Sequence, residues 1–310
     1  MTKPAPEIST PPAPGRGEQL LGSGYSVAMA LLFSVVVIFA ATVRTGGRPF
    51  VMLSIRFALA SILLFVGVAL MGRPLLPVRG ERRAVILAGT VGYATESALY
   101  FAALSHGKAG AVTLLFYTYP VWVMLATIAM DRRVPAGRLL TALGLALVGS
   151  VVVVVGGGKV EVEPMGIVLA VACSLVYASY LVAADRTVKR TDPLTAAAWL
   201  SGGAALGNLI YAVVFRTTVV PSGVHDWLHI LGMAVFSAAA FAAMLAGLRR
   251  VGALRNSIVG MMEPFAVAIL AWIVLHQSIT VSTAVGGALI LTGAVMASLV
   301  RTTQLQEPNL

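Results

Sequence analysis

The fold is decided by two stretches of sequence that are diverged copies of one another, YPVWVMLATIAM at residues 119–130 and EPFAVAILAWIV at residues 263–274. Both are apolar, both carry a proline at their second position, and they lie 144 residues apart. The same offset, without gaps, aligns other helix-breaking residues. The aligned pairs are Pro49 with Pro193, Pro120 with Pro264, and Gly149 with Gly293. Chance similarity between apolar segments does not readily align three such pairs, so the sequence predicts an internal repeat.

Composition places the chain in a membrane. Of its 310 residues, 58% are hydrophobic and only 11% are charged, whereas a soluble domain carries about 25% charged residues. Ten apolar runs of about 20 residues are each long enough to cross a ~30 Å hydrocarbon core as a helix. They lie at about 24–43, 49–71, 84–103, 109–130, 135–155, 165–185, 193–215, 227–248, 254–275 and 281–300. The sequence therefore predicts an all-α multi-spanning membrane protein with ten transmembrane helices.

The repeat unit contains five of these spans, which is an odd number. The second copy must therefore cross the membrane in the opposite direction to the first, giving two inverted five-helix repeats at 23–156 and 157–301 around a central cavity. Inverted repeats are a transporter architecture, with the substrate site near the membrane midplane between the halves. Residues 1–22, which are Pro-rich, are expected to form a disordered cytoplasmic tail, and 302–310 a second tail. The short connections leave no room for an enzyme domain, and no enzyme activity is expected.

Basic residues favour one side of the membrane. Most of the 22 Lys and Arg residues fall in alternate connections, for example at Arg79, Arg132, Arg190 and Arg250, on the side that also holds both termini. Since cytoplasmic loops carry the excess of Lys and Arg, the sequence predicts a multi-pass protein with both termini in the cytoplasm. The same distribution explains the net charge of +10 without a nucleic-acid partner.

The repeated prolines lie deep in their spans. Pro120 and Pro264 are about 16 Å and 14 Å from the span ends at 1.5 Å per residue, and a proline there frees backbone carbonyl groups. Freed carbonyls are tolerated only against protein or a water-lined cavity, so both prolines are predicted to kink their helices around one cavity, as hinges. Glu263 precedes the second proline, at the bend. Packing alone could explain the prolines, but it does not explain Glu263.

Polar and aromatic side chains line up on helical faces that this cavity would share. Tyr93, Glu96 and Tyr100 recur at i, i+3 and i+7, which is the spacing of one helix face. The full predicted lining is Tyr93, Glu96, Tyr100, Tyr117, Tyr177, Phe241 and Glu263. Aromatic rings with a few polar groups suit a small amphipathic solute. Tyr180 and Tyr211 are left open between this lining and anchoring at the membrane interface.

Arg56 is the basic residue that lies inside a predicted span. A charge in mid-membrane costs roughly 2.5–3.5 kcal/mol on insertion scales, so such a residue is either paired or functional. A structural ion pair is the favoured interpretation, with Glu96 as a candidate partner, and a role as a substrate ligand is the alternative. The repeat places Leu200 at the equivalent position, so only one half carries this charge.

Other chemistry is not indicated. The four histidines are too scattered for a metal site, and neither a metal nor a cofactor is expected. The GGGKV stretch at 156–160 lacks the spacing of a phosphate-binding loop, and no catalytic arrangement stands out.

Cys173, the single cysteine, is predicted to be a buried packing residue. The glycine-rich fifth and tenth spans are predicted to pack closely or to form the contact of a homodimer, away from the cavity.

These features resemble the drug/metabolite transporter superfamily, and more closely its EamA-type members. The resemblance is carried by YTYPVWVMLATIAMDRR, by MMEPFAVAILAWIVLHQSIT and by Arg56 in LSIRFALAS, and it covers essentially the whole chain. It implies a basket of eight helices around a central cavity, with the last helix of each repeat outside. It also implies export of metabolites, commonly amino acids, across the bacterial inner membrane. Within the family the chain is similar to the aromatic amino-acid exporters called YddG.

The chain departs from the family pattern at two places. The acidic residue that usually follows the ninth helix is replaced here by His276 and Gln277, which puts in doubt any coupling role for that acid. Tyr119 stands in the first repeat where Glu263 stands in the second.

Four functions are therefore weighed. An amino-acid or metabolite exporter working by alternating access is favoured. A multidrug exporter for lipophilic cations is the alternative, because carboxylates and aromatic rings also attract cations. A nucleotide-sugar carrier is disfavoured, since only Arg56 is available to meet a diphosphate, and a membrane-embedded enzyme lacks a catalytic pair. Proton coupling at Glu263 or Glu96 is left open.

Overall fold

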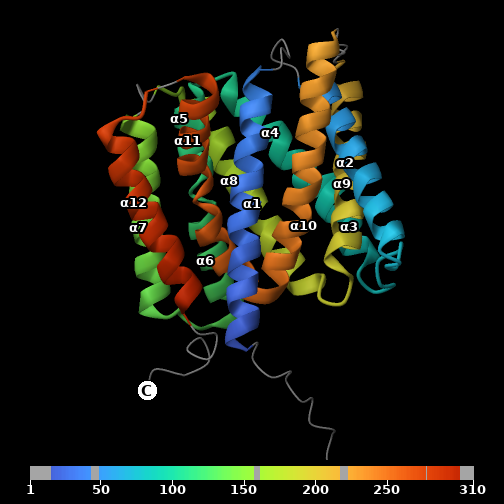
Figure 1. The fold of residues 1–310 in the computed structure, drawn as a ribbon, viewed down its shortest axis with the longest axis horizontal. Coiled ribbons are helices and arrows are strands. Elements are labelled where there is room, and N and C mark those ends of the chain that lie inside the picture. Colours follow the sequence, from blue (N-terminus) through green and yellow to red (C-terminus); the bar gives the residue numbers. More distant parts are fainter. Residues whose placement is uncertain (1–14, 43–48, 157–160, 217–222, 277, 301–310) are drawn as a thin grey trace, which may run out of the picture.

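The computed structural model describes residues 15–42, 49–156, 161–216, 223–276 and 278–300, and almost all of them are helical (Figure 1). The tails at 1–14 and 301–310 lie outside the described residues. The helices are α1 (Arg16–Thr42), α2 (Phe50–Leu70), α3 (Arg82–Leu87), the π-helix η1 (Ala88–Tyr93), α4 (Ala94–Leu104), α5 (Ala109–Phe116), α6 (Tyr119–Asp131), α7 (Gly137–Gly156), α8 (Pro164–Thr187), α9 (Pro193–Val214), α10 (Val224–Gly260), α11 (Glu263–Leu275) and α12 (Val281–Leu299).

The ten predicted spans are all present as helical stretches, although several are broken. Eight stretches among the described residues are long and apolar enough to cross a membrane, and α11 is a shorter apolar helix. The third span consists of α3, η1 and α4, and the fourth of α5 and α6. α10 contains the eighth span and the start of the ninth, separated by Gly252 at φ 77° and ψ 168°, and α11 completes the ninth. The prediction of a multi-spanning all-α protein is confirmed.

One boundary differs from the prediction, because α1 begins at Arg16 rather than near residue 24. Residues 16–22, assigned from sequence to the tail, are therefore helical. The buried side of this extension, which includes Gly22, lies against the second repeat, where a Cβ atom at Gly22 would be 2.6 Å from Cβ of Arg250. Contact with the other half thus extends the helix beyond the apolar run that marks it in the sequence.

The internal repeat is visible residue by residue in the backbone. At the offset of 144, the first residue of α6 falls on the first residue of α11, and the last residue of α6 falls on the last of α11. Both helices end in a left-handed residue, Arg132 at φ 53° and His276 at φ 54°, which is a common way to end a helix. Gly72 at φ 61° and Arg216 at φ 49° form a second such pair. Two halves with matching helix ends and matching turn residues therefore make up the bundle.

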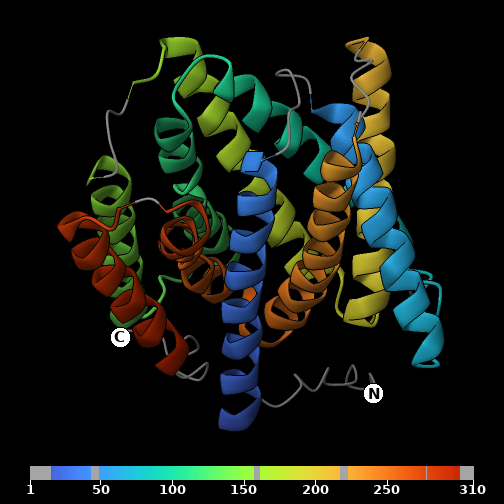
Figure 2. The ribbon, with the colours of Figure 1, turned by 45° about the horizontal axis from the view of Figure 1, so that its top comes forward.

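Pairs of equivalent helices occupy the two ends of the bundle in both views (Figures 1 and 2). α7 packs against α12 at one end, and α2 packs against α9 at the other. α1 lies between them and packs along α10, while its repeat equivalent α8 packs along α4. The remaining helices, which include the two broken spans α5–α6 and α10–α11, lie between the end pairs. This arrangement agrees with the expectation that the last helix of each repeat stays outside a central group.

The α7–α12 contact depends on glycines related by the repeat. A Cβ atom at Gly149 of α7 would lie 2.6 Å from the backbone oxygen of Gly286, and one at Gly293 of α12 would lie 2.6 Å from the backbone oxygen of Ala142. Gly149 and Gly293 are themselves repeat equivalents. Small residues let membrane helices approach until their backbones touch. The predicted close packing of the fifth and tenth spans is therefore found, within one molecule.

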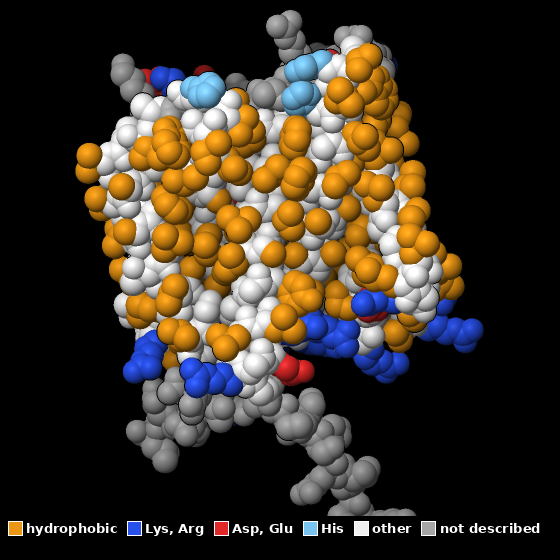
Figure 3. Space-filling model, viewed as in Figure 1, with side chains coloured by type: hydrophobic (Ala, Val, Ile, Leu, Met, Phe, Trp, Pro, Cys, Tyr) orange, Lys and Arg blue, Asp and Glu red, His pale blue; other side chains and the backbone are white. Residues whose placement is uncertain are grey.

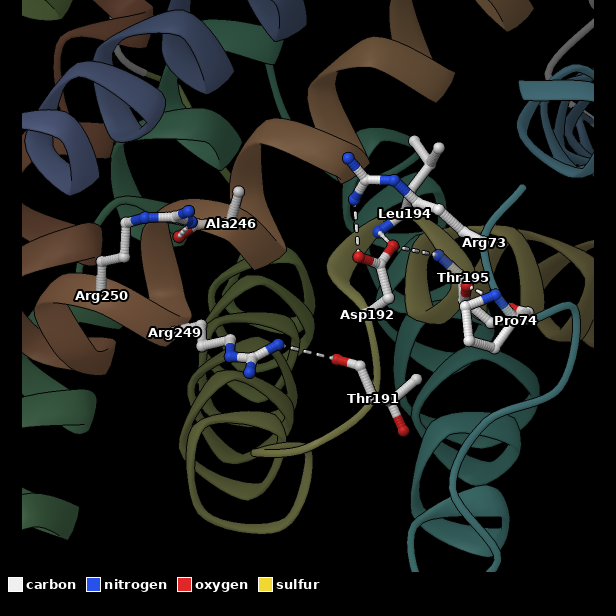
Figure 4. A network of polar contacts seen from close by, with 9 residues as sticks. All are labelled: Arg73, Pro74, Thr191, Asp192, Leu194, Thr195, Ala246, Arg249 and Arg250. Atoms are coloured by element: carbon white, nitrogen blue, oxygen red, sulfur yellow. Dashed lines mark hydrogen bonds and ion pairs between the residues drawn. The ribbon is translucent and has the colours of Figure 1, made fainter. Parts of the chain in front are cut away.

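A polar network joins the two halves at the end of the bundle where α1 begins (Figure 4). The side chain of Arg73 lies 2.6 Å from Asp192, which also caps the start of α9 by accepting hydrogen bonds from the backbone of Leu194 and Thr195. Arg249 of α10 donates to the backbone oxygen of Thr191 at 3.1 Å. The connection after α2 is thus held against the connection between α8 and α9.

Glu81 is the buried centre of this network. Its carboxylate accepts hydrogen bonds from the backbone N–H groups of Lys189, Arg190 and Thr191 at 2.8–3.0 Å, and from the Thr191 hydroxyl at 2.6 Å. Burial alone raises the pKa of this carboxyl, but the hydrogen bonds together outweigh burial and hold the pKa below its usual 4.5. Glu81 therefore stabilises the fold as an anion.

Replacing Glu81 with glutamine is expected to lower the free energy of unfolding by roughly 3 kcal/mol, because a neutral amide loses charge-assisted hydrogen bonds and places its own donors against N–H groups. The folded pKa is below the unfolded one, so the stabilisation is fully present above about pH 4.5 and is lost as pH falls through the folded pKa. Thermal unfolding of detergent-solubilised protein at pH 7 and at pH 4 measures both effects. The exposed Glu18→Gln is the control, and equal losses for both variants would contradict this role.

Candidate substrate site between the repeats

The two proline-containing spans are broken in mid-membrane, at equivalent positions. α5 ends at Phe116 and α6 begins at Tyr119, while α10 ends at Gly260 and α11 begins at Glu263. The predicted kinks are therefore wrong in detail, since Pro120 and Pro264 lie in the first turns of new helices. Proline is tolerated there because the first N–H groups of a helix have no intrahelical partner. The breaks bring helix ends, with their free backbone groups, into the centre of the bundle.

Glu263 is the first residue of α11, and its side chain is half-buried. The N-terminus of a helix carries partial positive charge, so a carboxylate is favourable at this position. Glu263 interacts electrostatically with Tyr100, Tyr117 and Tyr119 of the first repeat and with Glu96 of α4. A carboxylate at a helix break thus faces the other half of the molecule.

The predicted aromatic residues are joined into one continuous cluster of rings. Tyr93 contacts Phe241 at 5.0 Å between ring centroids and Tyr180 at 6.2 Å, and Tyr180 contacts Tyr177 at 5.8 Å. Phe116 links Tyr177 to the remaining members, which are Tyr100 at 5.8 Å and Tyr117 at 5.7 Å. These rings come from η1, α4, the α5–α6 break, α8 and α10. The structure therefore brings together, at the interface of the repeats, all five aromatic residues predicted from sequence.

Glu96 lies close to this cluster but is more deeply buried than Glu263. Its side chain accepts a hydrogen bond from the Ser97 hydroxyl at 3.2 Å, and Cys173 on α8 lies 3.8 Å from the other carboxylate oxygen. Cys173 is itself fully buried, as predicted, and its thiol also contacts the backbone oxygen of Glu96. The two acids of the site therefore stand in different surroundings, Glu96 held by small side chains and Glu263 facing tyrosines.

Arg56 on α2 is also buried beside the cluster. Its guanidinium carbon lies 4.4 Å from the centroid of the Phe57 ring, and it interacts electrostatically with Tyr93 and Glu96. No carboxylate of a described residue comes within 4.0 Å of its nitrogens, so the predicted direct ion pair with Glu96 is not formed. The Nε atom of Arg56 is buried without a hydrogen-bond partner among the described residues. The Nε–H group of Arg56 is therefore available to donate a hydrogen bond in the site.

Two tyrosines of the site are absent from the predicted lining. Tyr180 is only 4% exposed and its hydroxyl lies 3.7 Å from the Met244 sulfur, so anchoring at the membrane interface is wrong for it. Tyr119 packs at a right angle on Tyr177, with ring centroids 4.8 Å apart, and donates to the backbone oxygen of Ser257 at 3.2 Å. Its equivalence to Glu263 in the repeat was the signal that could have identified it.

The arrangement offers groups that can bind a small solute. Carboxylates can meet an ammonium group, the guanidinium of Arg56 can meet an anion, and tyrosine rings can pack against apolar or cationic parts of a solute. Among the described residues, no three His, Cys, Asp or Glu side chains gather into a metal site. Two inverted repeats with such a cluster between broken helices define a membrane protein of the inverted-repeat transporter class.

The comparison with known families gives the same result. The chain matches the EamA-like transporter family twice, over residues 20–155 and 164–299. It therefore belongs to that family, as two EamA domains, and is a small-molecule transporter of the membrane. The two matched ranges are offset by 144 residues at both ends, which confirms the repeat found in the sequence.

Individual relatives carry transporter names. An uncharacterized transporter of Synechocystis sp. is 28% identical over 189 residues, which is 59% of this chain and 56% of that protein. An uncharacterized transporter of Archaeoglobus fulgidus is 26% identical over 201 residues, covering 64% of this chain and 71% of that protein. The uncharacterized transporter YcbK of Bacillus subtilis is 26% identical over 234 residues, covering 71% and 74%. The first match thus spans little more than half of the Synechocystis protein.

A solved structure shows the same fold. A crystal structure titled only as that of a protein superimposes with a TM-score of 0.78 at 19% sequence identity, covering 94% of this chain and all of that one.

Proposed function

We propose that this protein exports amino acids, aromatic ones among them, or similar small metabolites across the bacterial inner membrane by alternating access. The observation that carries the proposal is Glu263, a half-buried carboxylate at a mid-membrane helix break that faces a cluster of tyrosines. An amino acid needs a partner for its ammonium group and one for its carboxylate. Glu263 and Arg56 offer these two charges beside aromatic rings, which suit an apolar or aromatic side chain.

The distribution of charge supports the proposed orientation in the membrane. Lys and Arg side chains gather at the end of the bundle where α1 begins, while the opposite edge of the same face carries histidines (Figure 3). Because the cytoplasmic side of a membrane protein holds the excess of Lys and Arg, this charge distribution supports a cytoplasmic location for the end where α1 begins.

The contact between Tyr119 and Ser257 supports alternating access. It joins α6 of the first repeat to α10 of the second at 3.2 Å. The repeat equivalent of this pair is Glu263 with Thr113. A carboxylate accepts rather than donates, so the mirror contact needs the Thr113 hydroxyl as donor, and that hydroxyl is bonded here to Tyr100 at 2.8 Å. When inverted repeats exchange conformations, the site opens to the other side. We infer that the Tyr119–Ser257 bond belongs to one state and that its mirror bond belongs to the other.

Replacing Tyr119 with phenylalanine is therefore expected to shift the population towards the other access state about fivefold, since a buried hydrogen bond contributes ~1 kcal/mol. Labelling of single cysteines introduced at the two membrane faces, in a variant lacking Cys173, measures the shift. Tyr177→Phe is the matched control, because it removes an equally buried hydroxyl whose contact, with Met244, stays within the second repeat. An identical labelling pattern for both variants would remove Tyr119 from this role.

The substrate is tested by counterflow in proteoliposomes, with purified protein, a panel of labelled amino acids and no imposed gradient. Saturable exchange that is weakened by Tyr100→Ala and by Glu263→Gln is expected. No saturable exchange of any amino acid would overturn the substrate assignment while leaving the fold and family unaffected.

A second candidate, export of lipophilic cations, has one observation in its favour. The site contains two carboxylates, Glu96 and Glu263, against a single basic group, Arg56, and the rings around them can stack on a cation. The same proteoliposomes loaded with labelled tetraphenylphosphonium distinguish the candidates. Saturable exchange of the cation but of no amino acid would favour this second function.

A further inference from the structure

We propose that His225 and His229 bind a transition-metal ion, such as Zn²⁺, Ni²⁺ or Cu²⁺, at the end of the bundle opposite the termini. The two histidines lie four residues apart in the first turns of α10, in the stretch HDWLH at 225–229. This spacing places both on one helix face. Their ring centroids are 4.0 Å apart and their planes are inclined by 33°. Neither residue belongs to the candidate substrate site.

Hydrogen bonding fixes which ring nitrogen of His229 is free. Its Nδ1 lies 2.7 Å from the backbone oxygen of His225. A carbonyl oxygen can only accept, so Nδ1 carries the proton and Nε2 of the neutral ring presents its lone pair. Metal-binding histidines almost always donate their other ring N–H in this way, which holds the ring in place. His229 is further oriented by the ring of Phe39, 5.6 Å away.

A carboxylate lies beside the second histidine. Nδ1 of His225 lies 3.7 Å from Oδ1 of Asp226, beyond hydrogen-bond distance, so the carboxylate faces this nitrogen without being bonded to it. Nε2 of His225 is free, because no described residue hydrogen-bonds to it. Its side chain is 69% exposed, so an ion can approach from solution.

The geometry suits a chelate. Two nitrogens at 2.0–2.1 Å from a tetrahedral ion are roughly 3.3 Å apart. The rings, with centroids 4.0 Å apart and planes inclined by 33°, are near enough to supply them once the exposed His225 ring turns so that both lone pairs point at the ion. Imidazole ligands favour the later first-row ions and zinc over Mg²⁺ or Ca²⁺. No group of three potential ligands occurs among the described residues, so water completes the coordination. The sequence prediction of no metal site rested on the scatter of the four histidines, whereas this proposal uses the i, i+4 pair within HDWLH.

The proposal is tested by titrating Ni²⁺ and Zn²⁺ into the full chain in lipid nanodiscs, after removal of any affinity tag and treatment with EDTA. One equivalent of ion is expected to bind, and His225→Ala or His229→Ala should weaken binding at least tenfold. The control is the double variant His106→Ala with His276→Ala, which should bind unchanged. Asp226→Asn should weaken binding by about tenfold through loss of the carboxylate beside His225.

The dependence on pH gives a second readout. Affinity should fall as the pH is lowered, because a metal ion binds only the unprotonated nitrogen of an imidazole. All of these variants are at exposed or half-buried positions at a helix end, and thermal unfolding verifies that they fold. Binding that persists when both His225 and His229 are alanine, or no binding by the native chain, would overturn the proposal.

Discussion

Replacing Glu263 with glutamine is expected to lower substrate exchange by roughly tenfold to a hundredfold and to flatten its dependence on pH. The loss corresponds to one charge-assisted hydrogen bond to a substrate ammonium group, which contributes about 1.5–3 kcal/mol. The flattening follows because glutamine has nearly the same shape but neither gains nor loses a proton. Counterflow measured from pH 5.5 to pH 8.5 tests both parts.

Other titratable groups near Glu263 also contribute to the pH dependence of exchange. The groups that interact with Glu263 are Glu96 and Tyr100 on α4, Tyr117 at the α5–α6 break, Tyr119 on α6, Tyr93 on η1 and Tyr177 on α8. Glu96→Gln is therefore the matched control inside the site, and Glu18→Gln is the control on the surface. A profile that is unchanged in Glu263→Gln but altered in Glu96→Gln would transfer the proton-binding role to Glu96.

Replacing Gly149 with valine is expected to destabilise the protein by about 3 kcal/mol, the upper part of the range for overpacking. Any Cβ atom there meets the backbone oxygen of Gly286 at 2.6 Å, and backbone cannot move aside as a flexible side chain can. The two helices must then separate and lose their contact along α7 and α12. Unfolding in detergent, followed by circular dichroism, measures the loss.

Gly144→Val is the control for this prediction because it lies on the same helix, is exposed, and has no atom within 4 Å of an added Cβ. It carries the same change in helix propensity without the clash. Similar losses of stability in Gly144→Val and Gly149→Val would show that propensity, and not the α7–α12 contact, decides the result.

The fold could be predicted because the residues that end or interrupt its helices act locally and recur in both repeats. Pro49, Pro120 and Gly149 each recur one repeat later, and each acts on its own backbone wherever the chain places it. Apolar runs in a membrane have few alternatives to helix, since every backbone polar group must be paired within the segment. The spans, the repeat and its inversion can therefore be predicted without knowing which helices pack against one another.

The features that the sequence did not predict depend on contacts between helices that are far apart in the sequence. The π-helix η1 lies against α9 so closely that a Cβ atom at Gly89 would be 2.2 Å from the backbone oxygen of Leu200, a contact with no local signal. Tyr180 lies in the aromatic cluster because α8 packs against η1, and this packing has no signal near Tyr180 in the sequence. The aromatic residues that cluster could be predicted because helical spacing alone puts such residues on one face. The distance from Arg56 to Glu96 depends instead on how two helices pack.

The gap-free equivalence of the two repeats has a thermodynamic consequence. If both halves had the same sequence, every conformation open to one side of the membrane would have an inverted counterpart of equal free energy, and neither would be preferred. The energy difference between the two states must therefore reside in positions where the halves differ. Two such differences are described above, Arg56 against Leu200 and Tyr119 against Glu263, and the same offset adds Glu96 against Ala240. Making the two residues of one such pair identical would remove the contribution of that pair to the energy difference.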